Sequence, residues 1–283
     1  MKRYSLPQLR LGATSFLLHA DYVPAVRFAA ERCDDVALLL LETGENGAYL
    51  PTPEDIREIG RICNGEGASL HVHLPTDADF ATEHSARILA AKARLAIERA
   101  APLGAHSFVL HMDFPMARMP QAGFAQGFSE AQYVWARAAL DAIIAALPAP
   151  ELLAIENLEN FSPNFWDTWV AAYGCSRCLD IGHIWKDGGD PAFVLQAWLP
   201  RIRVIHLHGL ESVGQWVCDH KSLRCMPPAR IDAIMHPLWR RGYEGVLTLE
   251  VFSEAEFAAS HAILLQSWER YACSQSMPES DNV

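Results

Sequence analysis

The sequence predicts an α/β fold, a single closed (β/α)8 or TIM barrel, from three observations. Short β-rich runs alternate with longer helical patterns along the whole chain, as in repeated βα units around a parallel sheet. Eight such alternations occur, and 283 residues fit one barrel of this type. No linker-like tract divides the interior, so we expect one domain over residues 1–273 and a disordered tail at 274–283.

The expected strands are short apolar runs between polar or turn residues. In chain order they cover Leu9–Phe16, Val36–Leu41, Ala68–Leu74, Ser107–Met112, Leu152–Glu156, Arg177–Ile181, Val204–His208 and Val246–Val251. A doubly wound open sheet is the main alternative, but no Gly-x-Gly-x-x-Gly motif follows the first strand.

The expected helices carry apolar residues mostly at i, i+3 and i+4 spacing. They cover Val23–Arg32, Pro53–Cys63, Ser85–Ala100, Glu130–Leu147, Phe165–Tyr173, Pro191–Trp198, Ala229–Arg240 and Glu254–Tyr271. Local chemistry supports some of the starts: Thr52-Pro53-Glu54 supplies a cap, a first-turn proline and an acidic residue in order. The loop Phe114–Phe128 falls outside the repeat.

Composition and charge exclude several classes of protein. With 51 % hydrophobic and 20 % charged residues, the chain is neither disordered nor a coiled coil. A net charge of −11 opposes tight binding to nucleic acid or to anionic membranes. The longest apolar run, Val36–Leu41, is far shorter than the ~20 residues of a membrane span, and no signal peptide is recognised. We expect a soluble, cytoplasmic protein.

The seven cysteines are odd in number and scattered, which favours reduced thiols over a disulfide framework. Cys175 and Cys178 have Cys-x-x-Cys spacing, but no second pair follows and they lead into an apparent buried strand. We expect a structural or incidental role for this pair.

Polar residues end six consecutive expected strands, at the end of a barrel where active sites lie. A single histidine in a strand is often an ordinary core residue, but packing alone does not predict six such strands in succession. These residues are His71, His73, His111, Asp113, Glu156, Asp180, His183, His206, His208 and Glu250, with Asp219 and His220 in an expected loop after the seventh strand.

A metal ion is the economical explanation for the two glutamates. Glu156 and Glu250 each follow an apolar strand, where an unpaired buried carboxylate would cost several kcal/mol. A divalent ion would satisfy them together with Asp180 and His206, because oxygen and imidazole ligands suit Zn²⁺, Mn²⁺ or Co²⁺. The sequence therefore predicts a divalent-metal site of one to three ions.

The strand ends also carry a resemblance. The segments HLP, LHMD, IEN, DIGH, HLHG and LEVF resemble the xylose isomerase-like barrel superfamily, which joins sugar isomerases and epimerases with metal-dependent apurinic endonucleases of AP endonuclease family 2. The resemblance spans nearly the whole chain. It implies that Glu156, Asp180, His206 and Glu250 bind a divalent metal.

The phosphodiester-cleaving branch of that superfamily implies further ligands. His73, His111, His183, Asp219 and His220 stand at matching places. In the endonucleases the last pair has Asp-x-His spacing, whereas Asp219 and His220 are adjacent here, so either of them could be the ligand.

Longer segments resemble the cobamide-remodelling phosphodiesterases, a bacterial subgroup: CDDVALLLLE, HVHLP, CLDIGH, VIHLHG, DHKSL and GVLTLEVFSEAEF. This implies metal-dependent hydrolysis of the phosphoribosyl bond in the nucleotide loop of a vitamin B12-type coenzyme, giving cobinamide phosphate and an α-riboside. The alternative is a single-metal sugar or keto-acid isomerase or epimerase. A DNA-repair endonuclease is weakened by the acidic charge, and a non-catalytic corrinoid- or sugar-binding barrel is a further alternative.

The expected roles follow from these interpretations. Glu156 or Glu250 would accept the proton of an attacking water, with His183 as a further catalytic residue. His73, His111, His183 and His220 would complete the metal coordination or contact the phosphate.

The expected substrate is a small corrinoid or sugar-like molecule, and the oligomeric state is not predicted. The candidate contacts to this substrate are Glu42, His208, Trp185 and Trp216. Further apolar side chains in the expected loops would wall the mouth of the barrel or merely pack the loops. They are Phe114, Met116, Met119, Phe124, Phe128, Trp185 and Trp216.

Overall fold

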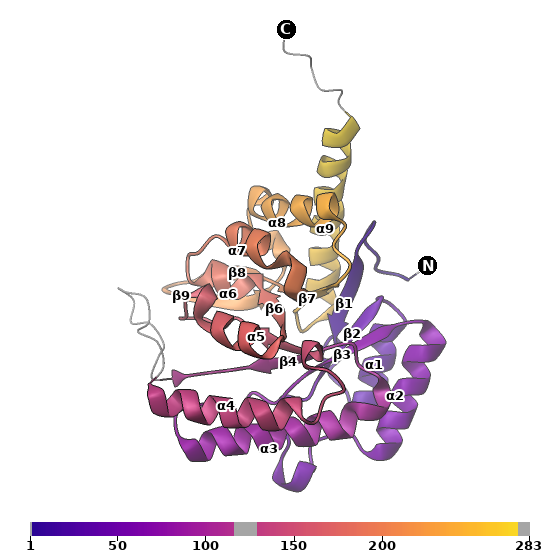
Figure 1. Cartoon of the computed structure of the whole chain (residues 1–283). Helices are drawn as coiled ribbons and strands as arrows, with labels where there is room; N and C mark the ends of the chain where they lie inside the picture. Colours follow the sequence, from indigo (N-terminus) through magenta and orange to yellow (C-terminus); the bar gives the residue numbers. More distant parts are fainter. Residues whose placement is uncertain (1, 116–128, 277–283) are drawn as a thin grey trace.

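The computed structural model describes residues 2–115 and 129–276 of the chain. Within these ranges, parallel strands close into a barrel with helices around it (Figure 1). The strands are β1 (Arg10–Thr14), β2 (Asp35–Leu39), β3 (Ser69–His73), β4 (Phe108–His111), β5 (Leu153–Glu156), β6 (Ser176–Asp180), β7 (Ile202–Leu207) and β10 (Val246–Leu249). They pair in this order, and β10 pairs back onto β1, so the predicted (β/α)8 barrel is confirmed.

Helices follow the strands and cover the outside of the barrel. They are α1 (Tyr22–Ala30), α2 (Pro53–Glu66), α3 (Glu83–Ala100), α4 (Glu130–Ile144), α5 (Asp167–Tyr173), α6 (Ile181–Lys186), α7 (Pro191–Trp198), α8 (Pro228–Arg241) and α9 (Glu254–Ser276). Short 3-10 turns are η1 (Glu45–Gly47), η2 (Ala101–Leu103), η4 (Pro150–Leu152), η5 (Pro163–Trp166), η6 (Leu199–Arg201) and η7 (Leu223–Cys225). In Figure 1, α3 and α4 lie side by side along the lower edge.

The predicted cap of α2 is present. The Thr52 hydroxyl accepts a hydrogen bond from the Asp55 backbone N–H, and the Asp55 carboxylate accepts one from the Thr52 N–H. This reciprocal arrangement satisfies donors that a helix start leaves free. Among the described helices, none combines the length and apolar character needed to span a bilayer.

Two elements beside the barrel mouth were not predicted. Helix α6 begins directly after β6, where the Asp180 carboxylate accepts a hydrogen bond from the His183 N–H at 2.7 Å. The hairpin β8 (Gly209–Val213) and β9 (Trp216–Lys221) replaces the loop expected after the seventh strand, so the loop prediction for Asp219 and His220 is wrong. The hairpin strands are largely exposed, including their apolar residues Val213, Trp216 and Val217, and they lack the longer apolar run by which the barrel strands were recognised.

The two predicted irregular segments lie only in part within the described residues. Helix α9 continues to Ser276, so residues 274–276 belong to a helix and not to the expected tail, while 277–283 lie outside the described residues. Residues 116–128 also lie outside them, and with them Met116, Met119, Phe124 and Phe128.

The barrel interior contains an apolar cluster and, at the carboxyl ends of the strands, a polar layer. Val109, Ala154, Cys178 and Val204 form a separate buried cluster inside the barrel. At its carboxyl end the strand register sets His111 beside Glu156 and Asp180 beside His206. The sheet itself therefore assembles the polar layer that ends the strands.

The cysteines are all free thiols. Cys178 lies in the interior cluster, whereas Cys175 belongs to the main apolar core, so the pair does not face a common point. Burial raises the pKa of the Cys175 thiol to about 12. This placement is that of buried structural thiols.

Candidate metal centre

Three carboxylates and one imidazole meet at the carboxyl end of the barrel. Glu156, Asp180, His206 and Glu250 offer ligand atoms that all lie within 4.8 Å of one another, and all four residues are buried. The Nδ1 atom of His206 lies 3.1 Å from Glu156 Oε1, 3.3 Å from Glu250 Oε2 and 4.0 Å from Asp180 Oδ2. Consecutive barrel strands thus deliver the four groups to one point.

The charges in this group call for a cation. Asp180 Oδ2 is buried without a hydrogen-bond partner, although a buried carboxylate oxygen is costly to leave unpaired. Burial tends to raise the pKa of Glu156, but the neighbouring His206 and His111 hold it well below its usual range. Burial likewise opposes charge on His183, yet Asp180 and Glu156 raise the pKa of its imidazole to about 9.

The donor set therefore fits a divalent ion. Without an ion, protons on the histidines must balance the carboxylates, and a metal would replace those protons. Carboxylate oxygens with an imidazole nitrogen are the ligands that Zn²⁺, Mn²⁺ and Co²⁺ accept.

A second group adjoins Glu156 on its other oxygen. His111 Nε2 lies 2.9 Å and His73 Nε2 lies 3.3 Å from Glu156 Oε2, while His206 contacts Oε1. The Nδ1 atom of His73 is hydrogen-bonded to the Leu74 carbonyl at 3.0 Å, which fixes the ring and leaves Nε2 for the site. Glu156 is thus placed to bridge two groups of ligands.

A third group consists of His183, His208 and His220, again with ligand atoms within 4.8 Å of one another. His208 was expected to contact substrate, but its ring is fully buried. Its Nδ1 accepts a hydrogen bond from the His220 N–H at 3.0 Å, and its Nε2 faces Asp180 Oδ1 at 3.4 Å. His208 therefore supports or completes this group, a role that the sequence interpretation missed.

A glycine makes room for His208. A Cβ atom on Gly182 would lie 2.0 Å from the His208 ring. The Asp-Ile-Gly-His segment at the start of α6 thus combines a carboxylate, a space and an imidazole within four residues, Asp180 to His183. The glycine was the available signal that a bulky group packs against this turn.

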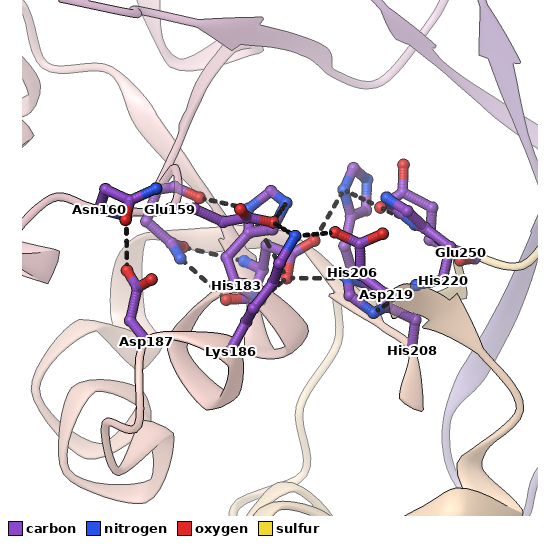
Figure 2. A network of polar contacts seen from close by, with 12 residues as sticks. Glu159, Asn160, His183, Lys186, Asp187, His206, His208, Asp219, His220 and Glu250 are labelled. Atoms are coloured by element: carbon purple, nitrogen blue, oxygen red, sulfur yellow. Dashed lines mark hydrogen bonds and ion pairs between the residues drawn. The ribbon is translucent and has the colours of Figure 1, made fainter. Parts of the chain in front are cut away.

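A β-bulge decides how Asp219 and His220 are presented. Between the pairs Glu211–Cys218 and Gly209–Lys221, β9 has one residue more than β8, and His220 has a left-handed φ of 50°. Because of the extra residue, both neighbouring side chains reach the mouth (Figure 2). His220 lies beside Glu250, with Nδ1 3.1 Å from the Glu250 carbonyl.

Asp219 turns to a lysine and not to the histidines. Lys186 Nζ pairs with Asp219 Oδ2 and with Glu159 Oε1, the latter at 2.7 Å (Figure 2). Burial opposes the effect, but the hydrogen bond from Lys186 lowers the pKa of Asp219 to about 2. Of the two alternatives, the structure brings His220 into the histidine group. Lys186 and Glu159 were missed, although each follows a strand end within six residues.

The remaining predicted residues lie outside these three groups. Glu42 is exposed after β2, and Trp216 is 69 % exposed near the tip of the hairpin. Trp185, also a candidate substrate contact, and Phe114 were expected to wall the mouth or to pack the loops, and in the structure both are buried. Trp185 is 4 % exposed and packs in the apolar core, and Phe114 is fully buried and stacks on Phe80 at 4.7 Å.

The fold and the site define a class: (β/α)8-barrel proteins whose buried carboxylates and histidines at the carboxyl ends of the strands are arranged for a divalent metal. Within this class, the chain belongs to the xylose isomerase-like TIM barrel family, whose profile matches residues 27–269. No curated protein matches the sequence significantly.

Solved structures share the fold at low sequence identity. A D-tagatose 3-epimerase-like protein has 18 % identity and a TM-score of 0.63, with 95 % of this chain and 100 % of the other covered. The 3-keto-D-glucoside 4-epimerase of E. coli has 13 % identity and a TM-score of 0.63 over 92 % and 99 %. A probable 3-DHS dehydratase of Bacillus anthracis has 14 % identity and a TM-score of 0.66 over 91 % and 98 %. The narrower resemblance to cobamide-remodelling enzymes finds no support in these comparisons.

Proposed function

We propose that the chain is a divalent-metal-dependent enzyme that acts on a small molecule, either a sugar or keto acid or a sugar-containing phosphodiester. The observation that carries the proposal is the buried group Glu156, Asp180, His206 and Glu250, in which a carboxylate oxygen is left without a partner. A divalent ion held there would supply the positive charge that polarises a substrate oxygen.

The first candidate reaction is isomerisation or epimerisation of a sugar or keto acid. The similarity to structures named as sugar epimerases supports it, and one metal with two glutamates suffices for it. Of the two, Glu250 is 7 % exposed and Glu156 only 1 %, so Glu250 is the more accessible proton acceptor for a substrate carbon. Glu156, held by three histidines, is better placed to stay fixed.

The second candidate is hydrolysis of a phosphodiester, including the phosphoribosyl bond of a cobamide nucleotide loop. One observation favours it: the histidine groups on both sides of the four-residue group exceed what a single ion needs. His73 and His111, which both contact Glu156, would extend the ligand set on one side, and His183, His208 and His220 would extend it on the other. Several cations suit a phosphodiester, because its charge and that of the leaving oxygen both need stabilisation.

The experiment that separates the two begins with the metal content of the purified chain by plasma mass spectrometry. The chain is then incubated with ketoses and keto acids in D₂O, read by NMR, and with coenzyme B12, read by mass spectrometry for cobinamide phosphate and an α-riboside. Glu156→Gln is compared with Glu244→Gln, an exposed glutamate before β10 at the opposite end of the barrel.

One ion per chain with deuterium at a substrate carbon supports the isomerase. Two or three ions with the cobamide products support the hydrolase. In either case Glu156→Gln must abolish the reaction and Glu244→Gln must not. A wild-type chain that binds no divalent metal overturns both.

A further inference from the structure

A groove on the outer wall of the barrel contains a buried arginine. The groove has a volume of about 320 Å³ and lies between α5 and α7. Its walls include Asp167 and Val170 of α5, Arg177 of β6, Trp198 of α7 and Arg201 of η6. We call it the outer groove, and none of these residues belongs to the metal centre.

Arg177 points away from the barrel interior. Successive side chains of a strand point to opposite faces, and Cys178, the next residue, lies in the interior cluster. Leu179, the residue after Cys178, belongs to the main apolar core, as is usual beneath the helices of a barrel. Arg177 is only 4 % exposed, although a buried guanidinium loses its hydration at a cost that an apolar side chain avoids. Packing alone therefore does not account for an arginine at this position.

The fold holds this guanidinium in place and leaves part of it unused. Its central carbon lies 3.7 Å from the centroid of the Trp198 ring, and one of its nitrogens donates to Asp167. Among the residues that the structure describes, Asp167 is the one hydrogen-bond acceptor of this side chain. The other guanidinium nitrogens are not sealed in the core, so their N–H groups open onto the groove.

Positive charge exceeds negative charge in the groove. Arg201 is exposed, lines the same groove and forms no ion pair within the described part of the chain. Two guanidinium groups thus share the single carboxylate of Asp167, whose side chain is 48 % exposed. Burial lowers the pKa of Arg177, Asp167 opposes this effect and Arg201 adds to it, because the two cations repel each other. In a chain of net charge −11, this is a local excess of positive charge.

A second groove of similar size shows a different balance. It lies between α3 and α4, has a volume of about 330 Å³ and is also lined by two arginines, Arg87 and Arg94. Each of them pairs with a glutamate on its own helix, Glu83 and Glu98 respectively, and their side chains are 78 % and 50 % exposed. The charges in that groove are paired and solvated, so it offers an internal control.

We propose that the outer groove binds the phosphate group of a small molecule, with Arg177 and Arg201 donating to its oxygens. Guanidinium groups bind phosphate oxygens in pairs through charge-assisted hydrogen bonds, and a phosphate has oxygens enough for two arginines. The volume is at the lower end of the range for ligand pockets, which suits a phosphate on a small molecule. Because Arg177 and Asp180 leave β6 on opposite faces, this site is separate from the metal centre and does not rest on the function proposed above.

The test measures the dissociation constants of inorganic phosphate, ribose 5-phosphate and uncharged ribose by calorimetry. The full chain is loaded with Mn²⁺ and freed of excess metal, and the wild type is compared with Arg201→Ala and with the matched control Arg94→Ala. We expect Arg201→Ala to weaken phosphate binding roughly tenfold and Arg94→Ala, which removes the same charge elsewhere, to leave it unchanged. Binding of ribose should not depend on Arg201. Dependence with both phosphates identifies free phosphate as a sufficient ligand, whereas dependence with ribose 5-phosphate alone identifies a phosphate ester.

Two further variants locate the site. Arg177→Lys keeps the charge but loses the planar fork, and it should weaken phosphate binding as Arg201→Ala does. If Arg177→Lys does not fold, Arg201→Ala still decides, because it changes an exposed residue. In Asp180→Ala, which disrupts the metal centre, the binding that depends on Arg201 should persist.

Three results would overturn the proposal. The first is an equal affinity of the wild type and Arg201→Ala for both phosphates. The second is an equal loss in Arg201→Ala and Arg94→Ala, because the effect would then come from net charge alone. The third is a binding component that depends on Arg201 but disappears in Asp180→Ala, since it would then belong to the metal centre.

Discussion

The two ends of the barrel interior both contain carboxylates and histidines, but their balance of donors and acceptors differs. At the amino-terminal end Asp35 Oδ1 is 2.6 Å from His71 Nδ1, and Oδ2 is 2.8 Å from His106 Nε2. Every oxygen of this single carboxylate has a donor, and Ser69 and Arg10 lie beside it. At the carboxyl end, three carboxylates share the histidines and an oxygen of Asp180 is left over.

The unpaired atoms differ as well. At the amino-terminal end the unpaired atom is Nε2 of His71, a ring whose pKa burial lowers, so that the neutral form is favoured. At the carboxyl end the unpaired atoms include Nε2 of His208 and an oxygen of Asp180, a carboxylate that stays ionised. Ligand residue types alone do not distinguish a structural cluster from a metal centre; the excess of buried negative charge does.

The largest expected effect comes from removing one of the three carboxylates at the carboxyl end. Asp180→Ala should lower turnover at least ~1,000-fold, because the ion that polarises the substrate loses a ligand. It should also abolish the rise in Tm that Mn²⁺ gives the wild-type chain, worth about 2.7 kcal/mol at a hundredfold excess over Kd. Differential scanning fluorimetry with and without Mn²⁺ checks this, and an unchanged shift in the variant would contradict the assignment.

At the amino-terminal end, where every carboxylate oxygen has a donor, the opposite is expected: stability should fall and metal binding should not. Asp35→Ala leaves the buried His71 and the partly exposed His106 without their carboxylate, and we expect a loss of about 3 kcal/mol in the free energy of unfolding with an unchanged metal content. Urea denaturation and metal analysis measure the two quantities. Loss of metal together with Asp35 would mean that the two ends are not independent.

The contacts of Asp35 with its two histidines also predict how the stability of the fold depends on pH. Burial opposes ionisation, but His71 and His106 hold the pKa of Asp35 well below its ordinary value. A depressed pKa stabilises the folded state above the unfolded value of about 3.9, and this contribution is lost as pH falls below it. The difference in unfolding free energy between wild type and Asp35→Asn should be constant above pH ~5 and shrink toward acid. A difference that grows on acidification would be the contrary result.

A smaller effect is expected from the space beside His208. In Gly182→Ala the new methyl group would overlap the His208 ring, so the ring must move, at a cost of about 1–3 kcal/mol. The third histidine group should lose metal affinity while the four-residue group keeps its ion. Metal titration with a chelator competitor separates the two.

The smallest effect is expected at the rim. Lys186 is a quarter exposed and its ion pairs with Glu159 and Asp219 are partly solvated, so Lys186→Gln should cost below about 1 kcal/mol of stability. Metal content should not change. A lost ion would place Lys186 and Asp219 within the metal centre after all.

The barrel and most of the site could be predicted because both depend on local patterns. Apolar runs identify the parallel strands, and the residue that ends each run faces the common mouth. Glu156, Asp180, His206 and Glu250 were accessible in this way, and the structure brings them together. What was missed depends on long-range packing. The burial of Trp185 follows from α6, and the role of His208 follows from the space at Gly182.

The extra residue in β9 has a consequence for protein engineering. Asp219 and His220 are consecutive in the chain, and both side chains reach the barrel mouth only because of the bulge. The contribution of the hairpin therefore depends on its strand register. Grafting it onto another barrel of this shape requires the residue count between Cys218 and Lys221 to be kept, whatever the residues around it. Shortening that span by one residue would restore a regular ladder and leave a single side chain in place of the two that now reach the mouth.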